Sequence, residues 1–285
     1  MSVIGKQFIF QAKEAANNLE PLAEGLWTSS EHTDLGFLSN DETDWETIEP
    51  LSFWHRHRNR MFLEMLQRFP PSGTLFEIGA GAGSVTMALQ DAGYPVVGVE
   101  PTDSLAVRAR ARGVKNLVRS TLENAHFRNG ALHNIGMFDV LEHIPDDQEY
   151  LRNLRQLMPE GGRFYCAVPA WNFLWSNEDD AADHIRRYSL PELVAKLNNA
   201  GFELEMATYY FAILLPPILF LRSIPTRLGL RRKRTHEASH REHILKPGLV
   251  SSIVDFFLEL EFTRFKSGRP IHFGASVIAV AKAKS

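Results

Sequence analysis

A run of alternate glycines is the first feature of this sequence that could do chemistry. Gly79, Gly81 and Gly83 stand in the segment Glu77-Ile78-Gly79-Ala80-Gly81-Ala82-Gly83-Ser84. Glycines allow a tight turn and let a ligand lie against bare backbone, while the N-terminus of a following helix offers unpaired N–H groups. Glu100 follows at about the 20-residue offset at which an acid can accept both hydroxyls of a ribose. The alternatives are a turn that binds nothing and a solvated acid at a strand end.

Two histidines could act on an acceptor. His143 follows a predicted strand, so its imidazole could take a proton from a hydroxyl group near neutral pH; alternatively it only shapes the pocket and caps the next helix. His184 stands beside Arg186, Arg187 and Tyr188, which could bind an anionic or hydroxylated acceptor or form an ion-pair cluster that stabilises a loop. We expect His143 and His184 to be catalytic. Nothing fixes the geometry of the nearby aspartates, so no metal site is predicted.

Strands and helices that alternate along the chain must position these residues. Strands are expected at 74–78, 95–99, 114–119, 132–138, 163–168, 202–208 and 275–281, and helices at 53–69, 84–92, 104–112, 146–158 and 190–201. Such alternation predicts an α/β fold: a doubly wound, mostly parallel, seven-stranded, Rossmann-like sheet with right-handed crossovers. Ligands of such sheets lie beyond the carboxyl ends of the strands, which is where the glycines, Glu100 and His143 fall.

The sequence divides into four expected parts. Residues 1–52 form an acid-rich N-terminal extension with one helix around 7–19, and residues 53–210 form the ligand-binding core. Residues 211–272 form a helical insertion before the last core strand, which lies within 273–285. Helices at 211–221 and 250–262 would cover the pocket, and the second could pair protomers in a homodimer. Segment 209–234 is apolar beside basic residues, which also suits peripheral contact with an anionic membrane.

Composition excludes several classes. The chain has 285 residues, 44% of them hydrophobic, and a net charge of -3, which argues against bulk binding to nucleic acid. The single cysteine excludes an internal disulfide and fits a reducing compartment. No signal peptide is recognised at the N-terminus, and Pro216-Pro217 interrupts an apolar run shorter than the about 20 residues of a membrane span. We expect a cytoplasmic protein, with peripheral association at the inner membrane face as the alternative.

The glycine spacing differs from that of dinucleotide-binding dehydrogenases, in which the third glycine falls three positions after the second. It resembles the first motif of class I S-adenosylmethionine-dependent methyltransferases. The resemblance continues through Val97-Gly98-Val99-Glu100-Pro101, Phe138-Asp139-Val140-Leu141-Glu142-His143-Ile144 and Leu157-Met158-Pro159-Glu160-Gly161-Gly162-Arg163. These segments match, in order, the family's ribose-binding acid, its motif after the fourth strand and its turn before the fifth. The subgroup most similar is that of the ubiquinone and menaquinone biosynthesis methyltransferases.

The resemblance implies S-adenosylmethionine as cofactor and a methyl group that passes to a nucleophile. Thr121 and Leu122 would flank the adenine. Trp54 and Phe138 would offer aromatic faces to the sulphonium, and Arg58 could reach the cofactor's carboxylate; core packing and a solvated helix face are the alternatives. The cofactor-binding residues expected are Glu77, Gly79, Ala80, Gly81, Gly83, Glu100, Pro101, Thr121, Leu122, Phe138, Trp54 and Arg58.

The sequence therefore predicts a methyltransferase that acts on a small-molecule or lipid-like acceptor, at oxygen rather than at nitrogen or carbon. Two rival functions stay open. One is a nicotinamide-dependent oxidoreductase on a related sheet. The other is a non-catalytic protein that binds the cofactor or acts as a membrane adaptor.

Overall fold

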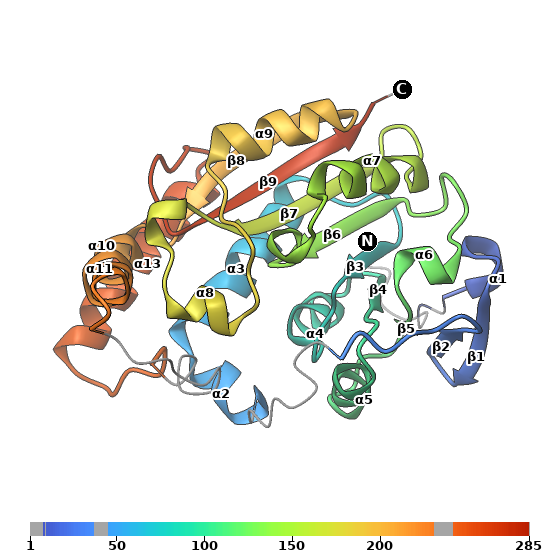
Figure 1. Cartoon of the computed structure of the whole chain (residues 1–285), viewed down its shortest axis with the longest axis horizontal. Coiled ribbons are helices and arrows are strands. Elements are labelled where there is room, and N and C mark those ends of the chain that lie inside the picture. Colours follow the sequence, from blue (N-terminus) through green and yellow to red (C-terminus); the bar gives the residue numbers. More distant parts are fainter. Residues whose placement is uncertain (1–7, 9, 37–44, 231–241, 285) are drawn as a thin grey trace, which may run out of the picture. The chain divides into compact units, whose positions relative to one another are not determined.

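The computed structural model describes residues 8, 10–36, 45–230 and 242–284 (Figure 1). The chain divides into two compact units. The first unit comprises residues 1–39, 71–136 and 156–162, and the second comprises residues 40–70, 137–155 and 163–285. Each unit is described by itself.

The first unit holds the strands that carry the glycine-rich segment. Its strand order is β1-β2-β5-β4-β3, from β1 (Leu19–Ala23), β2 (Leu26–Ser29), β3 (Leu75–Ile78), β4 (Val96–Val99) and β5 (Leu117–Arg119). Pairs β3–β4, β4–β5 and β2–β5 are parallel, and β1–β2 is antiparallel. All four residues of β3 and of β4 are buried, as expected of strands covered on both faces.

Helices α4 (Ser84–Asp91) and α5 (Asp103–Ala111) follow β3 and β4 directly. They close on the strands through small side chains: Ala80, Ala106 and Ala109 pack with Val114 and Leu117 in one buried cluster. Gly83 lies against the same cluster, where an added Cβ would meet Val114 Cγ2 at 2.7 Å. The close approach brings the start of α4 to the end of β3, as the sequence predicts.

The N-terminal extension contains a β-hairpin, which the sequence did not predict, and the helix expected around 7–19 is shorter than predicted. Within residues 10–36, which the structure describes, Ala12–Ala15 (α1) is helical, and β1 and β2 follow it. Gly25 makes the turn at a φ of +68°, and an added Cβ there would lie 1.9 Å from the carbonyl oxygen of Lys115. Since β2 pairs with β5, some 90 residues away, local periodicity carries no sign of it. With this hairpin the described residues hold nine strands rather than seven.

The second unit contains the strand order β7-β9-β8, from β7 (Arg163–Pro169), β8 (Phe202–Tyr210) and β9 (Ser276–Ala283). Strand β9 is antiparallel to both neighbours, so the sheet is mostly rather than wholly parallel. Strand β6 (Asn134–Phe138) begins in the first unit and ends in the second. Helix α9 (Leu190–Asn199) packs on β8 and begins at Ser189, whose hydroxyl accepts a hydrogen bond from Glu192 N, as its capping sequence predicts.

Three further helices belong to this unit. They are α2 (Trp45–Leu51), α3 (Phe53–Arg68) and α7 (Asp147–Leu157), the last of which runs past the unit boundary. Helix α3 is nearly the predicted 53–69. It begins at Ser52, whose hydroxyl accepts from His55 N, and its buried residues include Met61, Phe62 and Met65.

The insertion is helical, as predicted. A 3-10 turn (Ala212–Leu214) leads into α10 (Leu215–Ile218), a π-helical turn (Leu219–Ser223) and α11 (Ile224–Arg227), and after residues 231–241, which lie outside the described chain, α13 (Leu249–Lys266) follows. Glu261 of α13 accepts hydrogen bonds from Phe211 N and Ala212 N, both at 2.7 Å, and contacts His57 Nε2 of α3 at 2.8 Å. This buried carboxylate joins the start of the insertion to α3 and α13. None of the helices described has the length and apolar character needed to cross a membrane.

Candidate active site

The glycine-rich loop of the first unit leaves its backbone bare on one side. Gly79, Gly81 and Gly83 have φ angles of +73°, +55° and +83°, a region that favours glycine. A Cβ added at Gly81 would meet nothing within 4 Å, so the backbone there faces open space. Gly83 precedes α4 without a side-chain cap, which leaves N–H groups of the first helical turn available to a ligand. The loop fits the predicted role of a cradle.

Glu100 holds this loop at the end of β4. Its Oε2 accepts from Gly81 N and its Oε1 accepts from Thr102 N, both at 2.8 Å. Burial raises the pKa of this carboxyl above its ordinary value, against the two backbone N–H groups, which lower it. Each oxygen keeps a second lone pair. The residue can therefore order the loop and still accept a hydroxyl from a ribose.

The other predicted cofactor residues of the first unit differ in their contacts. Glu77 accepts a hydrogen bond from Thr86 Oγ1 of α4 at 2.5 Å, and Ala80 belongs to the buried cluster beneath the loop. Thr121 caps α6 (Leu122–Ala125) by accepting from Asn124 N, so its side chain is already engaged. Leu122 is buried, while Pro101 follows Glu100 directly and is half-buried.

Sequence reasoning missed a group that the N-terminal hairpin brings to these strand ends. Asp34 accepts a hydrogen bond from Asp103 N at the start of α5, and His32 Nε2 lies 2.8 Å from Asp103 Oδ1. Hydrogen bonds from Gly36 N and Asp103 N lower the pKa of the Asp34 carboxyl. Ser120, after β5, has a buried hydroxyl without a hydrogen-bond partner. No motif marks these residues, because their proximity depends on the hairpin.

In the second unit, Trp54 and Arg58 of α3 face the segment after β6. The Arg58 guanidinium lies 4.5 Å from the centre of the Trp54 ring and 3.3 Å from Asp139 Oδ2. Trp54 also stacks on Phe211, with ring centres 5.7 Å apart. Asp139 has a φ of +58°, which is rare outside glycine and typical of functional turns. Burial raises the pKa of its carboxyl, while the Arg58 charge opposes that effect.

Phe138 is part of the core rather than of an open wall. It is buried and stacks on Phe62 at 4.4 Å between ring centres. This geometry fits the alternative of core packing. Its role toward a sulphonium stays a prediction.

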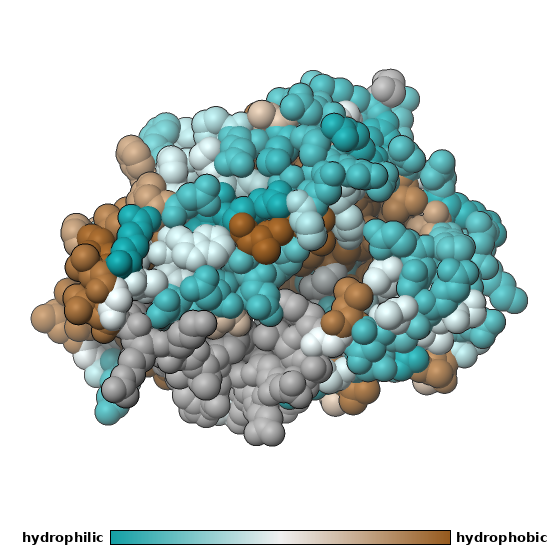
Figure 2. All heavy atoms as spheres, in the orientation of Figure 1, coloured by the Kyte–Doolittle hydropathy of each residue, from teal (hydrophilic) through white to brown (hydrophobic). Residues whose placement is uncertain are grey.

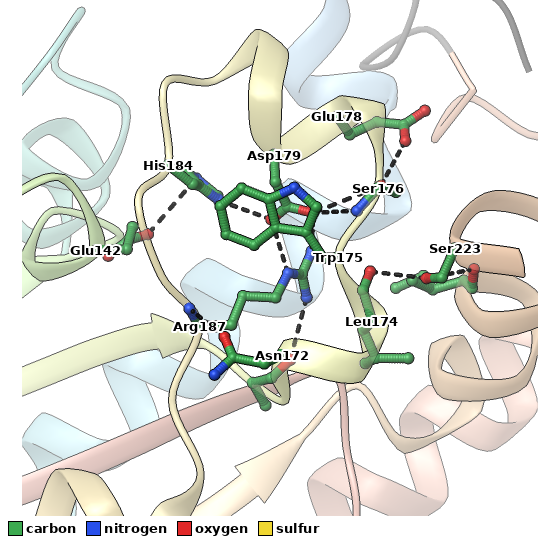
Figure 3. A network of polar contacts seen from close by, with 12 residues as sticks. Glu142, Asn172, Leu174, Trp175, Ser176, Glu178, Asp179, His184, Arg187 and Ser223 are labelled. Atoms are coloured by element: carbon green, nitrogen blue, oxygen red, sulfur yellow. Dashed lines mark hydrogen bonds and ion pairs between the residues drawn. The ribbon is translucent and has the colours of Figure 1, made fainter. Parts of the chain in front are cut away.

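Glu142, His143 and His184 lie together, and Figure 3 shows Glu142 and His184. Glu142, in the 3-10 turn Leu141–His143, is 0% exposed, and neither carboxylate oxygen has a hydrogen-bond partner. His184 Nε2 approaches its Oε1 at 3.8 Å. Burial and the Asp139 carboxylate raise the pKa of Glu142 well above its ordinary value. An unsatisfied buried carboxyl of this kind is typical of a site that receives a ligand.

The partners of the two imidazoles define which nitrogen can accept a proton. His184 Nδ1 lies 2.8 Å from Asp179 Oδ1, and His143 Nδ1 lies 3.2 Å from the carbonyl oxygen of Asp183. Since a carboxylate or carbonyl only accepts, Nδ1 donates in each neutral ring and Nε2 carries the lone pair. Both histidines can therefore act as bases through Nε2. Their ring centres are 5.0 Å apart.

The same three residues could hold a metal ion, although the sequence predicts none. One ligand atom from each of Glu142, His143 and His184 lies within 4.8 Å of the other two. The absence of a metal stays a prediction.

Asp179 also organises the loop that carries His184. It accepts from Arg187 Nε at 2.7 Å and Nη2 at 3.0 Å, and from Ser176 N at the start of α8 (Asn177–Ala181). Burial tends to raise the pKa of Asp179, but His184 and Arg187 outweigh it and lower the pKa. Arg186 in turn pairs with Asp147. These pairs fit the second interpretation given above, an ion-pair cluster that stabilises the loop.

A cavity of about 730 Å³ lies within the second unit. Its polar wall comprises Asp139, Glu142, Glu178, Asp179, His184 and Arg187. Its apolar wall comes mainly from the insertion: Leu214, Pro217, Ile218, Leu221, Pro225, Leu230, Leu245, Val250 and Val254. His184 and Trp54 line this cavity, whereas His143 lies beside it and is not among the lining residues. His243 also lines it; burial and the Arg222 charge lower its pKa to about 3, so this ring is neutral.

The insertion is tied to the polar wall by direct bonds. Ser223 Oγ donates to the carbonyl oxygen of Leu174 at 2.7 Å (Figure 3), and Arg227 donates to that of Phe173 at 2.8 Å. The helical turns of the insertion are thus fixed to the loop before α8. The cavity therefore has a charged wall and an apolar wall, and hydrogen bonds link the segments that carry them.

Comparisons with known proteins agree with the motifs. The model of a family described as a methyltransferase domain matches residues 53–206, more than half of the chain. The ubiquinone biosynthesis O-methyltransferase of Xanthomonas axonopodis pv. citri is 25% identical over 158 residues, which are 48% of this chain and 66% of that protein. The C-methyltransferase NovU of Streptomyces niveus is 29% identical over 132 residues, or 44% of this chain and 31% of that protein. The match thus spans less than two thirds of either relative.

A solved structure extends the likeness to most of the chain. It is a chain from the Haloferax volcanii complex between the Trm112 methyltransferase activator and a methyltransferase, with a TM-score of 0.57 at 14% identity. The alignment covers 89% of this chain and 98% of that one. At 14% identity the similarity shows a shared fold and nothing about activity.

Proposed function

Because the chain belongs to the methyltransferase-domain family, we propose that it transfers the methyl group of S-adenosylmethionine to a hydroxyl oxygen of a small or lipid-like acceptor. The observation that carries the proposal is the two-sided cavity of the second unit. One wall holds His184, Glu142 and Asp139, and the other is formed by apolar side chains of the insertion. An acceptor with a polar reactive end and an apolar remainder would satisfy both walls.

The first unit supplies residues that fit the cofactor. Gly81 offers bare backbone, Glu100 offers carboxylate lone pairs to ribose hydroxyls, and the unpartnered Ser120 hydroxyl offers a further polar contact. When bound, S-adenosylmethionine supplies an electrophilic methyl group on a sulphonium. Trp54, like Phe53, is an aromatic side chain of the cavity wall suited to a cation, and Arg58 beside Trp54 suits a carboxylate. These roles follow the residues that the sequence predicts.

His184 is the base best supported by its position. It lines the cavity, its Nδ1 is fixed by Asp179, and its Nε2 is left to take the proton of an acceptor hydroxyl. Asp179 would stabilise the imidazolium that results, as a buried carboxylate does for a catalytic histidine. His143 is the neighbouring candidate. Glu142, whose raised pKa favours the protonated form, can donate a hydrogen bond to the same acceptor oxygen.

Positioning contributes more than the base. Holding a nucleophile and an electrophile in near-attack geometry can lower a barrier by about 7 to 11 kcal/mol, whereas one proton transfer contributes about 10²- to 10⁴-fold in rate. The rigid pairs Asp179–Arg187 and Ser223–Leu174, which fix the cavity walls, therefore matter for the rate as well as for the shape.

The test is methyl transfer from deuterium-labelled S-adenosylmethionine into separate aqueous and lipid extracts, followed by mass spectrometry. The expected product is a methyl ether of a partly apolar compound, formed by the wild type and much more slowly by His184→Ala. Label on nitrogen or carbon would reject O-methylation. Binding of S-adenosylhomocysteine without any labelled product would favour the non-catalytic alternative, and a response to a nicotinamide dinucleotide would favour the oxidoreductase.

A further inference from the structure

The insertion of the second unit turns large apolar side chains outward. On α13, Leu249, Phe256 and Leu260 are 78%, 59% and 50% exposed. Phe262 and Phe265 of the same helix are buried. The exposed apolar side chains of residues 219–230 and 249–260 are called here the apolar face. Figure 2 shows hydrophobic side chains gathered over the part of the second unit where Figure 1 labels α10, α11 and α13. A contiguous exposed apolar surface of this kind marks an interaction site.

The cavity opens on the apolar face. Leu221, Leu230 and Val250 line the cavity, yet they are 68%, 75% and 65% exposed. A side chain can satisfy both conditions only at the mouth of the cavity. The entrance to the candidate acceptor site is therefore rimmed by the residues that an apolar partner would contact.

The sequence that links the two stretches of the apolar face is strongly basic. Residues 222–246 contain eight Lys and Arg residues against two Glu, a net charge of +6 in a chain whose total is -3. Lys246 before α13 and Arg264 and Lys266 in its last turn are exposed. Basic groups beside an apolar surface complement anionic lipid headgroups, at about 1 kcal/mol for each group near the surface.

We propose that the apolar face docks on an anionic lipid bilayer, with α13 lying in the headgroup region. A second copy of the chain is a weaker occupant, because it would cover the mouth of the cavity. The proposed contact is peripheral, with the helix in the plane of the interface. Docking itself does not depend on the proposed methyl transfer. If that function holds, docking places the mouth where a lipid-like acceptor can enter from the bilayer.

Co-sedimentation of the full chain with vesicles tests the proposal. We expect the wild type to bind vesicles that contain phosphatidylglycerol, to bind pure phosphatidylcholine weakly, and to lose binding as salt rises. The double variant Phe256→Glu, Phe257→Glu should bind the anionic vesicles at least about tenfold more weakly, because both side chains are exposed on the apolar face. Neither residue lines the cavity, so the change leaves the cavity wall intact. Val107→Glu, at an exposed apolar site on α5 of the first unit, is the control and should bind as the wild type does.

Three results would overturn the proposal. They are no binding of the wild type to anionic vesicles, binding that the double variant retains in full, and equal loss in the Val107→Glu control. Analytical ultracentrifugation separates the rival occupant: a dimer that the double variant dissolves, without vesicle binding, would assign the face to a second copy. S-adenosylhomocysteine affinity, measured on every variant, reports folding and the cofactor site. Failure to bind vesicles with unchanged S-adenosylhomocysteine affinity would therefore reject docking without rejecting the proposed function.

Discussion

Nδ1 of His184 lies 2.8 Å from Oδ1 of Asp179, a carboxylate that is itself held by Arg187. The bond orients the imidazole so that Nε2 faces Glu142 and the cavity. A base that is pre-oriented by a buried acid is the arrangement that general-base catalysis requires.

We expect His184→Ala to lower turnover by about 10²- to 10⁴-fold while S-adenosylhomocysteine affinity is unchanged, because the base acts on the acceptor and not on the cofactor. Added imidazole should restore part of the rate. Single-turnover methyl transfer and calorimetric titration measure the two quantities. His133→Ala, at an exposed histidine of the first unit, is the control.

His143→Ala should have a smaller effect, since His143 lies beside the cavity without lining it. A larger loss in His143→Ala than in His184→Ala would transfer the role of base to His143. Asp179→Asn should lower turnover too, but it also disturbs Arg187 and Ser176, so its melting temperature must be measured alongside.

Gly81 and Gly130 form a matched pair for testing the cofactor cradle. Both have positive φ, +55° and +74°, and a Cβ added at either would meet nothing within 4 Å. Replacement by alanine therefore costs a similar backbone strain of roughly 1–2 kcal/mol at both. Only at Gly81 would the Cβ enter the space proposed for the cofactor.

We accordingly expect Gly81→Ala to weaken S-adenosylhomocysteine binding by about tenfold or more, equivalent to about 1.4 kcal/mol, and Gly130→Ala to leave it unchanged. Isothermal titration measures the affinities, and thermal unfolding should give similar shifts for both variants. Equal affinity in the two variants would place the cofactor elsewhere.

Much of this architecture follows from the sequence. The helix at 53–69 and the strand, glycine turn and helix of 74–92 are found within one or two residues, because periodicity and local capping specify them. The methyltransferase family and its cofactor, inferred from the glycine spacing and the later motifs, are confirmed by the family match and by a relative named for S-adenosylmethionine.

Contacts between residues distant in the sequence were harder to predict from the sequence. The hairpin at Leu19–Ser29 exists because β2 pairs with β5, and Glu261 meets Phe211 N across 50 residues. No local pattern encodes such contacts. The role of Asp179 was hidden likewise, since three adjacent acids and a histidine give no geometry until the loop folds around Arg187.

Glu142 should make stability depend on pH in a defined direction. Its pKa is raised by burial and by Asp139, so the carboxyl stays protonated in the folded chain after it has ionised in the unfolded chain. Its contribution is therefore complete below its ordinary value of 4.5 and falls as pH rises toward the folded pKa, by about 1.4 kcal/mol for each pH unit between the two.

Glutamine cannot ionise, so Glu142→Gln should gain unfolding free energy relative to the wild type between pH 5 and pH 8. Urea unfolding at both values measures the difference, with Glu149→Gln, at an exposed position of α7, as control. A difference that is constant with pH, or that shrinks as pH rises, would contradict the assignment of Glu142 as a protonated acid.

Removal of metal ions should leave methyl transfer unchanged. Glu142, His143 and His184 could share an ion, but a protonated carboxyl is a poor ligand, and the proposed base works through His184 and Asp179 alone. We expect the same turnover before and after dialysis against EDTA, with elemental analysis of both samples. Loss of turnover that one divalent cation restores, together with lower metal content in His143→Ala and Glu142→Gln, would show instead that these three side chains bind a metal. The buried carboxylate of Glu142 would then be ionised, and the pH dependence predicted above would vanish in the metal-loaded protein.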